Sequence, residues 1–349
     1  MAAFKRMVAG MQTKHPERTL PEVVGDCLAR VVGIDLNDYA CALARARLVM
    51  TALELLGEKD FAVASRLHPQ VFWADALEQI ELDDAQGQMF AAGKPFAALT
   101  QSEVRAKLRP LLEDKFHAIV ANPPFITEKD AARKAYHREK VGHGKKKRQR
   151  YVSAYRTYSL GAPFTERMLD LTIENGFVGE ITANSFMKRE FGKALVHDVL
   201  PRHRLTKVVD TAGAHIPGHA TPTVILFARR QPSGTDPVPV VMGKRGEPGK
   251  PAVPAEGNVW RSILAGHDRL GFENEFVSVA PVERSVLAKH SWSIGGGGAA
   301  ELKEAIRDNR VTVISVAEPP IGRGARTGND DVFSLPAFVA CRYHAPDWR

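Results

Sequence analysis

The chain has 349 residues and a formal net charge of +8, which favours a polyanionic partner without identifying one. Its 44% hydrophobic and 25% charged residues are typical of a globular protein, and no apolar run approaches the roughly 18 residues of a membrane span. Three widely separated cysteines, Cys27, Cys41 and Cys341, form no metal-ligand pattern and fit a reducing cytoplasm, so we predict a cytoplasmic protein without a metal site.

The first part of the chain is predicted to alternate helices with short buried strands, each followed by an acid. Residues 4–30 have the pattern of two helices around a polar turn, and residues 39–56 carry apolar side chains at helical spacing. Asp35 ends one strand, and Asp75 follows a second strand. An acid in such a position either accepts hydrogen bonds from ribose hydroxyls or is an ordinary surface residue, such as a helix cap. Local sequence leaves both interpretations open.

The next strand, residues 116–121, ends in the turn Asn122-Pro123-Pro124-Phe125. Proline removes backbone donors and keeps the preceding residue extended, so the strand delivers a rigid polar turn to the edge where open α/β sheets bind ligands. The side-chain carbonyl of Asn122 and the backbone carbonyl of Pro123 can both accept from an exocyclic amino group, while Phe125 can stack on the ring. The alternative is an ordinary proline-rich turn.

The most polar part of the chain follows this turn. Residues 128–156 hold eleven Lys or Arg and three acids, an excess equal to the net charge of the whole chain. Cations on an exposed loop neutralise phosphates, and nearby aromatics can stack on an unpaired base. A solvated charge run is the alternative, and a nuclear signal a weaker one. The predicted nucleic-acid contacts are Lys145, Lys146, Lys147, Arg148, Arg150 and Tyr151.

A second series of helices and strands is predicted downstream. Helices are expected at residues 164–175 and 186–200, and strands at residues 177–182, 207–210 and 223–228. Together with the earlier elements they give a βαβ series that ends in a hairpin, the pattern of a Rossmann-like α/β sheet.

The rest of the chain carries weaker signals. His215 and His219 lack a third ligand, so we interpret them as loop residues. Residues 231–257 are rich in Pro and Gly and are predicted to be a linker or an extended crossing. The glycine-rich turn at residues 293–298 is interpreted as the entry to a helix rather than as a phosphate cradle, because no buried strand precedes it.

The Asn122 turn resembles the catalytic motif [Asp/Asn/Ser]-Pro-Pro-[Tyr/Phe/Trp] of the amino-group DNA methyltransferases that use S-adenosylmethionine (SAM), in the form typical of adenine N6 methylation. Residues 166–186 resemble the helix and strand that follow the motif in these enzymes, and residues 211–213 and 221–227 resemble their closing hairpin. Residues 246–249, 276–279 and 292–298 are similar to the PglX family of BREX phage-defence systems.

This resemblance implies a Rossmann-like SAM methyltransferase sheet in residues 1–230, followed by a linker and the start of a target-recognition region in residues 231–349. It implies a SAM site in which Asp35 binds the ribose, Leu36 and Asp75 lie at the adenine, and Asn122 also contributes. The motif residues Asn122, Pro123, Pro124 and Phe125 would hold the target base.

The implied substrate is double-stranded DNA with an adenine flipped out of the duplex, because its amino nitrogen must meet the methyl group in line. Other phage-defence proteins are expected partners, and a membrane is not. Two alternatives stay open: a methyltransferase that acts on RNA or on a protein glutamine, and an inactive remnant that binds DNA through its basic loop.

One family feature is missing. Members carry a glycine-rich SAM loop on a strand that precedes the strand of Asp35, and this sequence has no such motif before Val31. The resemblance therefore implies a fragment, or a shortened reading frame, whose sheet lacks a central strand. We expect such a chain to bind SAM weakly or not at all by itself, and to be poorly stable, because the neighbours of the missing strand have exposed edges.

Overall fold

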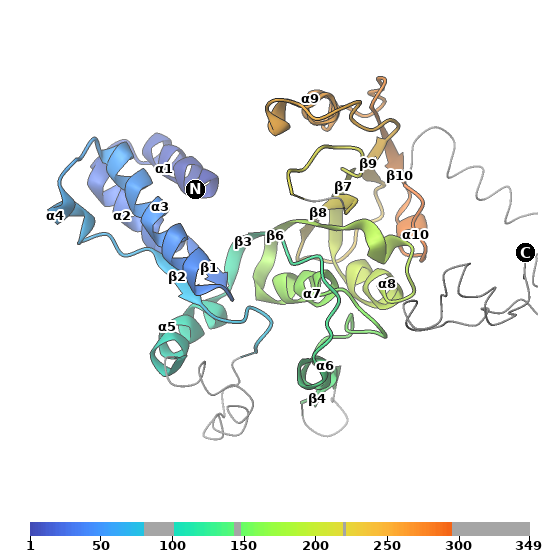
Figure 1. Cartoon of the computed structure of the whole chain (residues 1–349), viewed down its shortest axis with the longest axis horizontal. Helices are drawn as coiled ribbons and strands as arrows, with labels where there is room; N and C mark the ends of the chain where they lie inside the picture. The colour runs from blue at the N-terminus through green and yellow to red at the C-terminus, as the bar shows by residue number, and fades with distance from the viewer. Residues whose placement is uncertain (80–100, 143–147, 219–220, 295–349) are drawn as a thin grey trace, which may run out of the picture. The chain divides into compact units, whose positions relative to one another are not determined.

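The computed structural model describes residues 1–79, 101–142, 148–218 and 221–294 (Figure 1). They belong to one compact unit, Met1–Ala300, with mixed α and β structure. No helix in these ranges is long and apolar enough to cross a membrane.

The N-terminal part packs three helices against a two-stranded parallel sheet. Apolar residues of the helices meet the sheet in a core that includes Phe4, Val24, Leu48 and Val71. The two predicted helices, the strand that ends in Asp35 and the long helix after it are confirmed. The elements are α1 (Ala2–Lys14), α2 (Leu20–Arg30), β1 (Val32–Asp35), α3 (Asp38–Leu56), α4 (Phe61–Ala64) and β2 (Gln70–Trp73).

A six-stranded mixed sheet follows, with the order β10-β9-β7-β8-β6-β3. Strand β3 is parallel to β6 and β7 is parallel to β9, whereas β8 is antiparallel to both β6 and β7. The carboxyl ends of β3, β6, β7 and β9 therefore meet at one edge of the sheet. The strands are β3 (Phe116–Ala121), β6 (Thr172–Ala183), β7 (Arg204–Asp210), β8 (Thr223–Arg229), β9 (Val238–Gly243) and β10 (Val277–Val282).

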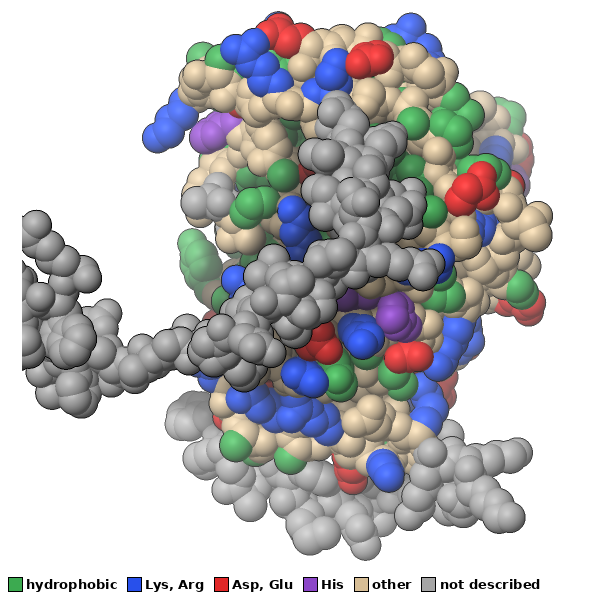
Figure 2. Space-filling model, turned by 90° about the vertical axis from the view of Figure 1, so that its right-hand side faces the viewer, with side chains coloured by type: hydrophobic (Ala, Val, Ile, Leu, Met, Phe, Trp, Pro, Cys, Tyr) green, Lys and Arg blue, Asp and Glu red, His purple; other side chains and the backbone are tan. Residues whose placement is uncertain are grey.

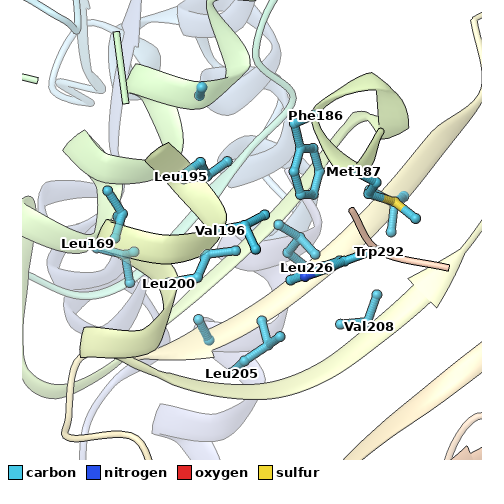
Figure 3. Close-up of a cluster of buried hydrophobic side chains, with 14 of the residues drawn as sticks. Leu169, Phe186, Met187, Leu195, Val196, Leu200, Leu205, Val208, Leu226 and Trp292 are labelled. Atoms are coloured by element: carbon cyan, nitrogen blue, oxygen red, sulfur yellow. The ribbon is translucent and has the colours of Figure 1, made fainter. Parts of the chain in front are cut away.

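Helices cover both faces of this sheet (Figure 1). On one face Leu169 and Leu195 pack with Leu226 and Trp292 in the largest core (Figure 3). The other face packs against Ile263 of α9. The remaining elements are α5 (Gln101–Asp114), α6 (Ala131–Arg138), the hairpin β4 (Lys140–Val141) and β5 (Arg148–Gln149), α7 (Gly161–Leu171), α8 (Gly192–Ala194), α9 (Asn258–Gly266) and α10 (Arg284–Leu287).

Two predicted helices are wrong in extent. Helix α7 ends at Leu171 rather than at residue 175, and the next residues already belong to β6. The backbone of Asn175 is in the left-handed conformation, with φ of 62°. It lies in the irregular first part of β6 and does not end a helix. The predicted helix at residues 186–200 is a series of short turns, which are 3-10 at Asn184–Met187 and Leu200–Arg202, α at α8 and π at Leu195–Val199.

The segment at residues 231–257, predicted to be a linker or an extended crossing, is part of the large sheet. It contains β9, which is buried and pairs with both β7 and β10. The surrounding Pro and Gly hid a strand of only six residues. The sheet therefore continues past residue 230, the position expected to end the catalytic domain. The predicted turn and helix after residue 294 lie outside the described residues.

Strand β3 is the edge strand of the large sheet, and β1 pairs with β2 alone among the described strands. The strand of Asp35 and the strand of the Asn122 turn thus belong to separate hydrogen-bonded sheets. Val120, next to the last residue of β3, is 76% exposed, and an exposed apolar edge strand favours aggregation.

Gly192 fixes the chain turn that follows β6. A Cβ atom at this position would lie 1.8 Å from the backbone oxygen of Phe186, so the backbone itself must move. We expect Gly192→Ala to lower the free energy of unfolding by about 3 kcal/mol.

The matched control is Gly10→Ala in helix α1, where a Cβ meets nothing within 4 Å. This change should stabilise the chain by about 0.5–1 kcal/mol, because alanine loses less backbone entropy in a helix. Urea denaturation of both variants measures the two effects. Equal stability of the Gly192→Ala variant and the parent would contradict the close approach.

Candidate active site at the carboxyl edge of the sheet

The Asn122 turn leaves β3 at the carboxyl edge with its polar side chain exposed. Asn122 and Pro124 are exposed, Pro123 is buried, and Phe125 is half-buried. The turn therefore combines an anchored proline with an amide group that is open to solvent. This arrangement leaves the predicted acceptor side chain accessible to a ligand.

The chain just after the turn is held by hydrogen bonds to residues about thirty positions downstream. The carbonyl of Ile126 accepts from Leu160 N at 2.9 Å and from Ser159 Oγ at 3.3 Å. The backbone nitrogen of Glu128 donates to the carbonyl of Tyr158 at 3.3 Å. These contacts fix the exit of the turn, which the prolines cannot do because they have no backbone donor.

Asp35 and Leu36 lie at the end of β1. The carboxylate of Asp35 is exposed and accepts from the backbone nitrogen of Asn37 at 2.8 Å. Leu36 is 52% exposed, and its carbonyl accepts from the Trp73 indole at 2.9 Å. Asn37, not Asp35, caps α3, since its side chain accepts from Ala40 N at 3.0 Å. Capping therefore does not explain Asp35, and its carboxylate has lone pairs free for a ligand.

Asp75, after β2, makes a different set of contacts. One carboxylate oxygen pairs with Arg133 Nη2 at 2.7 Å, and the other accepts from Leu77 N at 3.0 Å. Because β1 and β2 are parallel and Ala74 N donates to the Asp35 carbonyl, both acids lie at the same end of this small sheet.

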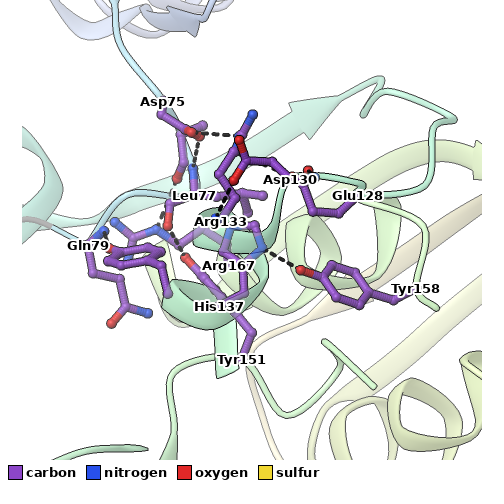
Figure 4. A network of polar contacts seen from close by, with 12 residues as sticks. Asp75, Leu77, Gln79, Glu128, Asp130, Arg133, His137, Tyr151, Tyr158 and Arg167 are labelled. Atoms are coloured by element: carbon purple, nitrogen blue, oxygen red, sulfur yellow. Dashed lines mark hydrogen bonds and ion pairs between the residues drawn. The ribbon is translucent and has the colours of Figure 1, made fainter. Parts of the chain in front are cut away.

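A polar network holds the loop of residues 75–79 against α6, α7 and the chain before α7 (Figure 4). Tyr151 donates its hydroxyl to the Leu77 carbonyl at 2.6 Å, and Gln79 N donates to the Tyr136 hydroxyl at 2.7 Å. The Arg167 guanidinium donates to the carbonyls of Ala76 and Glu78, each at 3.2 Å. The loop after β2, which carries Asp75, is thereby connected to the segment that follows the Asn122 turn.

This network corrects part of the predicted nucleic-acid surface. Tyr151 is fully buried, and burial raises the pKa of its phenol far above the ordinary value. Arg150 is 4% exposed, pairs with Glu139 at 2.8 Å and lies over the ring of Tyr136. Neither side chain presents a surface to a phosphate or a base, so we no longer assign them to nucleic-acid binding.

Only one of the predicted lysines and arginines is both described and exposed. Arg148 lies on β5, whose partner strand β4 carries the exposed Lys140. Lys145, Lys146 and Lys147 lie outside the described residues. On the face of the molecule drawn in Figure 2, many Lys and Arg side chains lie over the lower half.

The prediction missed a buried acid beside the turn. Glu180 of β6 pairs in register with Ala121, the residue before Asn122, and is 2% exposed. Its carboxyl group accepts from Thr165 Oγ1 at 2.6 Å, and burial raises its pKa to about 8. The signal was present, because the alternation of β6 places Glu180 on the same face as the buried Val178.

The raised pKa of Glu180 predicts a pH-dependent stability. Between about pH 5 and about pH 8 the folded chain keeps this proton while the unfolded chain has lost it. Stability therefore falls as pH rises, by about 1.4 kcal/mol per pH unit for this group, and levels off above the folded pKa. Glu180→Gln should remove this contribution.

Urea denaturation at several pH values measures the effect. The advantage of Glu180→Gln over the parent should grow with pH across this window, while Glu174→Gln, an exposed acid on the same strand, should leave the parent's profile unchanged. Parallel profiles for Glu180→Gln and the parent would contradict the buried protonated carboxyl.

Comparisons with known proteins show the family of the chain. Residues 29–216, more than half of the chain, match the family model described as Eco57I restriction-modification methylase. The chain is 34% identical over 355 residues to the adenine-specific methyltransferase PglX of Streptomyces coelicolor, covering 96% of this chain and 28% of PglX. It is 30% identical over 96 residues to the type II methyltransferase M.BstVI of Geobacillus stearothermophilus, covering 28% of this chain and 16% of M.BstVI.

Among solved structures, the type IIG restriction endonuclease BpuSI is similar with a TM-score of 0.46 and 12% identity, covering 93% of this chain and 35% of BpuSI. The family-model match over more than half of the chain makes this chain a methylase of the restriction-modification class. The chain belongs to the Eco57I restriction-modification methylase family. It spans less than a third of the length of the curated relatives that it matches.

Proposed function

We propose that this chain is the catalytic part of a DNA methyltransferase that acts on the N6 amino group of adenine in phage defence. The observation that carries the proposal is the exposed Asn122 on a turn that is anchored on both sides. Family membership supports the reaction class, and the similarity to an adenine-specific methyltransferase supports the base.

The turn acts by orienting the amine. The Asn122 side-chain carbonyl and the Pro123 backbone carbonyl accept its two N–H groups and leave the nitrogen lone pair free. Phe125 stacks on the ring, and Pro124 keeps the backbone extended. Holding the amine in line with the methyl donor is worth more here than proton transfer, so no general base is assigned.

SAM is the proposed methyl donor, and it supplies an electrophilic methyl group when bound. The residues at the ends of β1 and β2 fit its nucleoside part, because Asp35 has free lone pairs for ribose hydroxyls and Leu36 offers an exposed apolar side chain. Asp75 lies at the same end of this sheet, where it would face the adenine amino group.

The proposed substrate is double-stranded DNA with the target adenine flipped out. Exposed Arg148, with Lys145, Lys146 and Lys147 beside it in the sequence, is proposed to contact phosphates. Other phage-defence proteins are proposed as further partners.

Asn122→Ala tests the role of the turn. Because Asn122 is exposed, its removal takes away one acceptor for the amine and little packing. We expect methyl transfer from radiolabelled SAM to adenine in duplex DNA to fall by about a hundredfold or more, with an unchanged melting temperature. Asn258→Ala, an exposed asparagine at the start of α9, is the control. Activity within a few fold of the parent would remove Asn122 from the site.

Replacing Lys145, Lys146, Lys147 and Arg148 with Gln tests the phosphate contacts. DNA affinity should weaken on all sequences alike, and the slope of log affinity against log salt should flatten by about one unit for each lost contact. The control removes four exposed charges from the N-terminal part of the chain: Lys14, Arg30, Lys59 and Arg66. Equal slopes for both quadruple variants would show that the cluster acts only through net charge.

A further inference from the structure

Arg133, in the first turn of α6, lies between two carboxylates that come from different parts of the chain. Its Nη2 is 2.7 Å from Asp75 Oδ2, and its Nε is 3.4 Å from Glu128 Oε2 (Figure 4). The side chains of Arg133, Asp75 and Glu128 are 24%, 19% and 7% exposed. Solvent therefore screens this cluster less than it screens a surface ion pair.

Each carboxylate belongs to a different element of the proposed site. Asp75 follows β2 and faces the proposed cofactor. Glu128 is part of the fixed exit of the Asn122 turn, where its backbone nitrogen donates to Tyr158 and its Oε1 accepts from Asp130 N at 2.9 Å. Arg133 is thus a direct side-chain link between the cofactor end and the target-base end of the site.

Arg133 is the cation shared by both carboxylates. One guanidinium faces two carboxylates, and the neighbouring His137 adds no second cation at neutral pH, because burial lowers its pKa. Without Arg133 neither acid would keep an ion pair among the described residues, and the buried Glu128 would be left uncompensated. The loop after β2 and the exit of the turn would then lose their common anchor.

We propose that Arg133 is a positioning residue that couples SAM binding at Asp75 to the geometry of the Asn122 turn. The inference rests on the proposed function, because it requires Asp75 to face the cofactor. Arg133 acts through the two acids and needs no contact with the substrate. Coupling of this kind is reciprocal, so a bound target base must change the affinity for SAM by the same factor as SAM changes the affinity for the base.

Calorimetry with SAM titrated into the millimolar range, with and without an adenine-containing duplex, measures the coupling directly. In the parent the duplex should tighten SAM binding by about fivefold or more, and in Arg133→Gln this ratio should fall to about one. Arg133→Lys should restore part of it, since an ammonium reaches one acid but does not bridge two. Lys134→Gln removes the same charge from the next position of α6 and should keep the parent ratio.

Amide hydrogen exchange gives a readout that does not depend on methyl transfer. SAM alone should slow exchange of the backbone amides between Phe125 and Asp130 in the parent and in Lys134→Gln, but not in Arg133→Gln. A double variant, Arg133→Gln with Glu128→Gln, keeps the net charge of the cluster, leaves Asp75 in place and guards against simple unfolding. It should melt cooperatively and still lack the SAM-dependent protection.

Arg133→Gln with the parent's ratio and protection would overturn the proposal, as would a double variant that regains them. A parent chain that binds no SAM would overturn it too. A different result would contradict the proposed function: a parent chain that binds SAM and the duplex but transfers no methyl group to adenine.

Discussion

The contacts between residues 126–128 and residues 158–160 are the constraint on which the candidate site depends. A turn with two consecutive prolines has few donors of its own, so another part of the chain must hold it. Here a return segment accepts from Glu128 N and donates to the Ile126 carbonyl. The chain between the two segments, which includes α6, therefore serves the site by returning to the turn.

The cost of burying polar side chains explains why Tyr151 and Tyr158 are structural. The hydroxyl of Tyr151 is satisfied by the Leu77 carbonyl, and that of Tyr158 by His137 at 2.8 Å. Swinging either ring out to stack on a base would leave a buried partner unsatisfied, at about 1–3 kcal/mol each. Arg148 is under no such constraint because it lies on an exposed hairpin. Residues 148–158 thus contain both buried tyrosines that support the fold and an exposed arginine.

The strands that lead to the site were predictable from the sequence, because apolar runs that stop at an acid or a proline carry their own signal. This held for Asp35 and for the Asn122 turn. The extent of α7 was not predictable, since Asn175 can end a helix or bend a strand, and pairing with β3 decides between them. The link from Arg133 to Asp75 joins residues 58 positions apart. No local pattern marks a partner at that separation, whereas the alternation along β6 did mark Glu180.

The sheet topology gives this side-chain network a greater role than in a continuous sheet. Strands β1 and β2 do not pair with β3 among the described strands, so no ladder of backbone hydrogen bonds joins the acids to the Asn122 turn. Side-chain contacts from Arg133, Tyr151 and Arg167 make the connection instead, and each is worth only about 1–3 kcal/mol. A ligand held by the acids and a ligand held by the turn would therefore influence each other through these side chains, and the coupling would be the same in both directions.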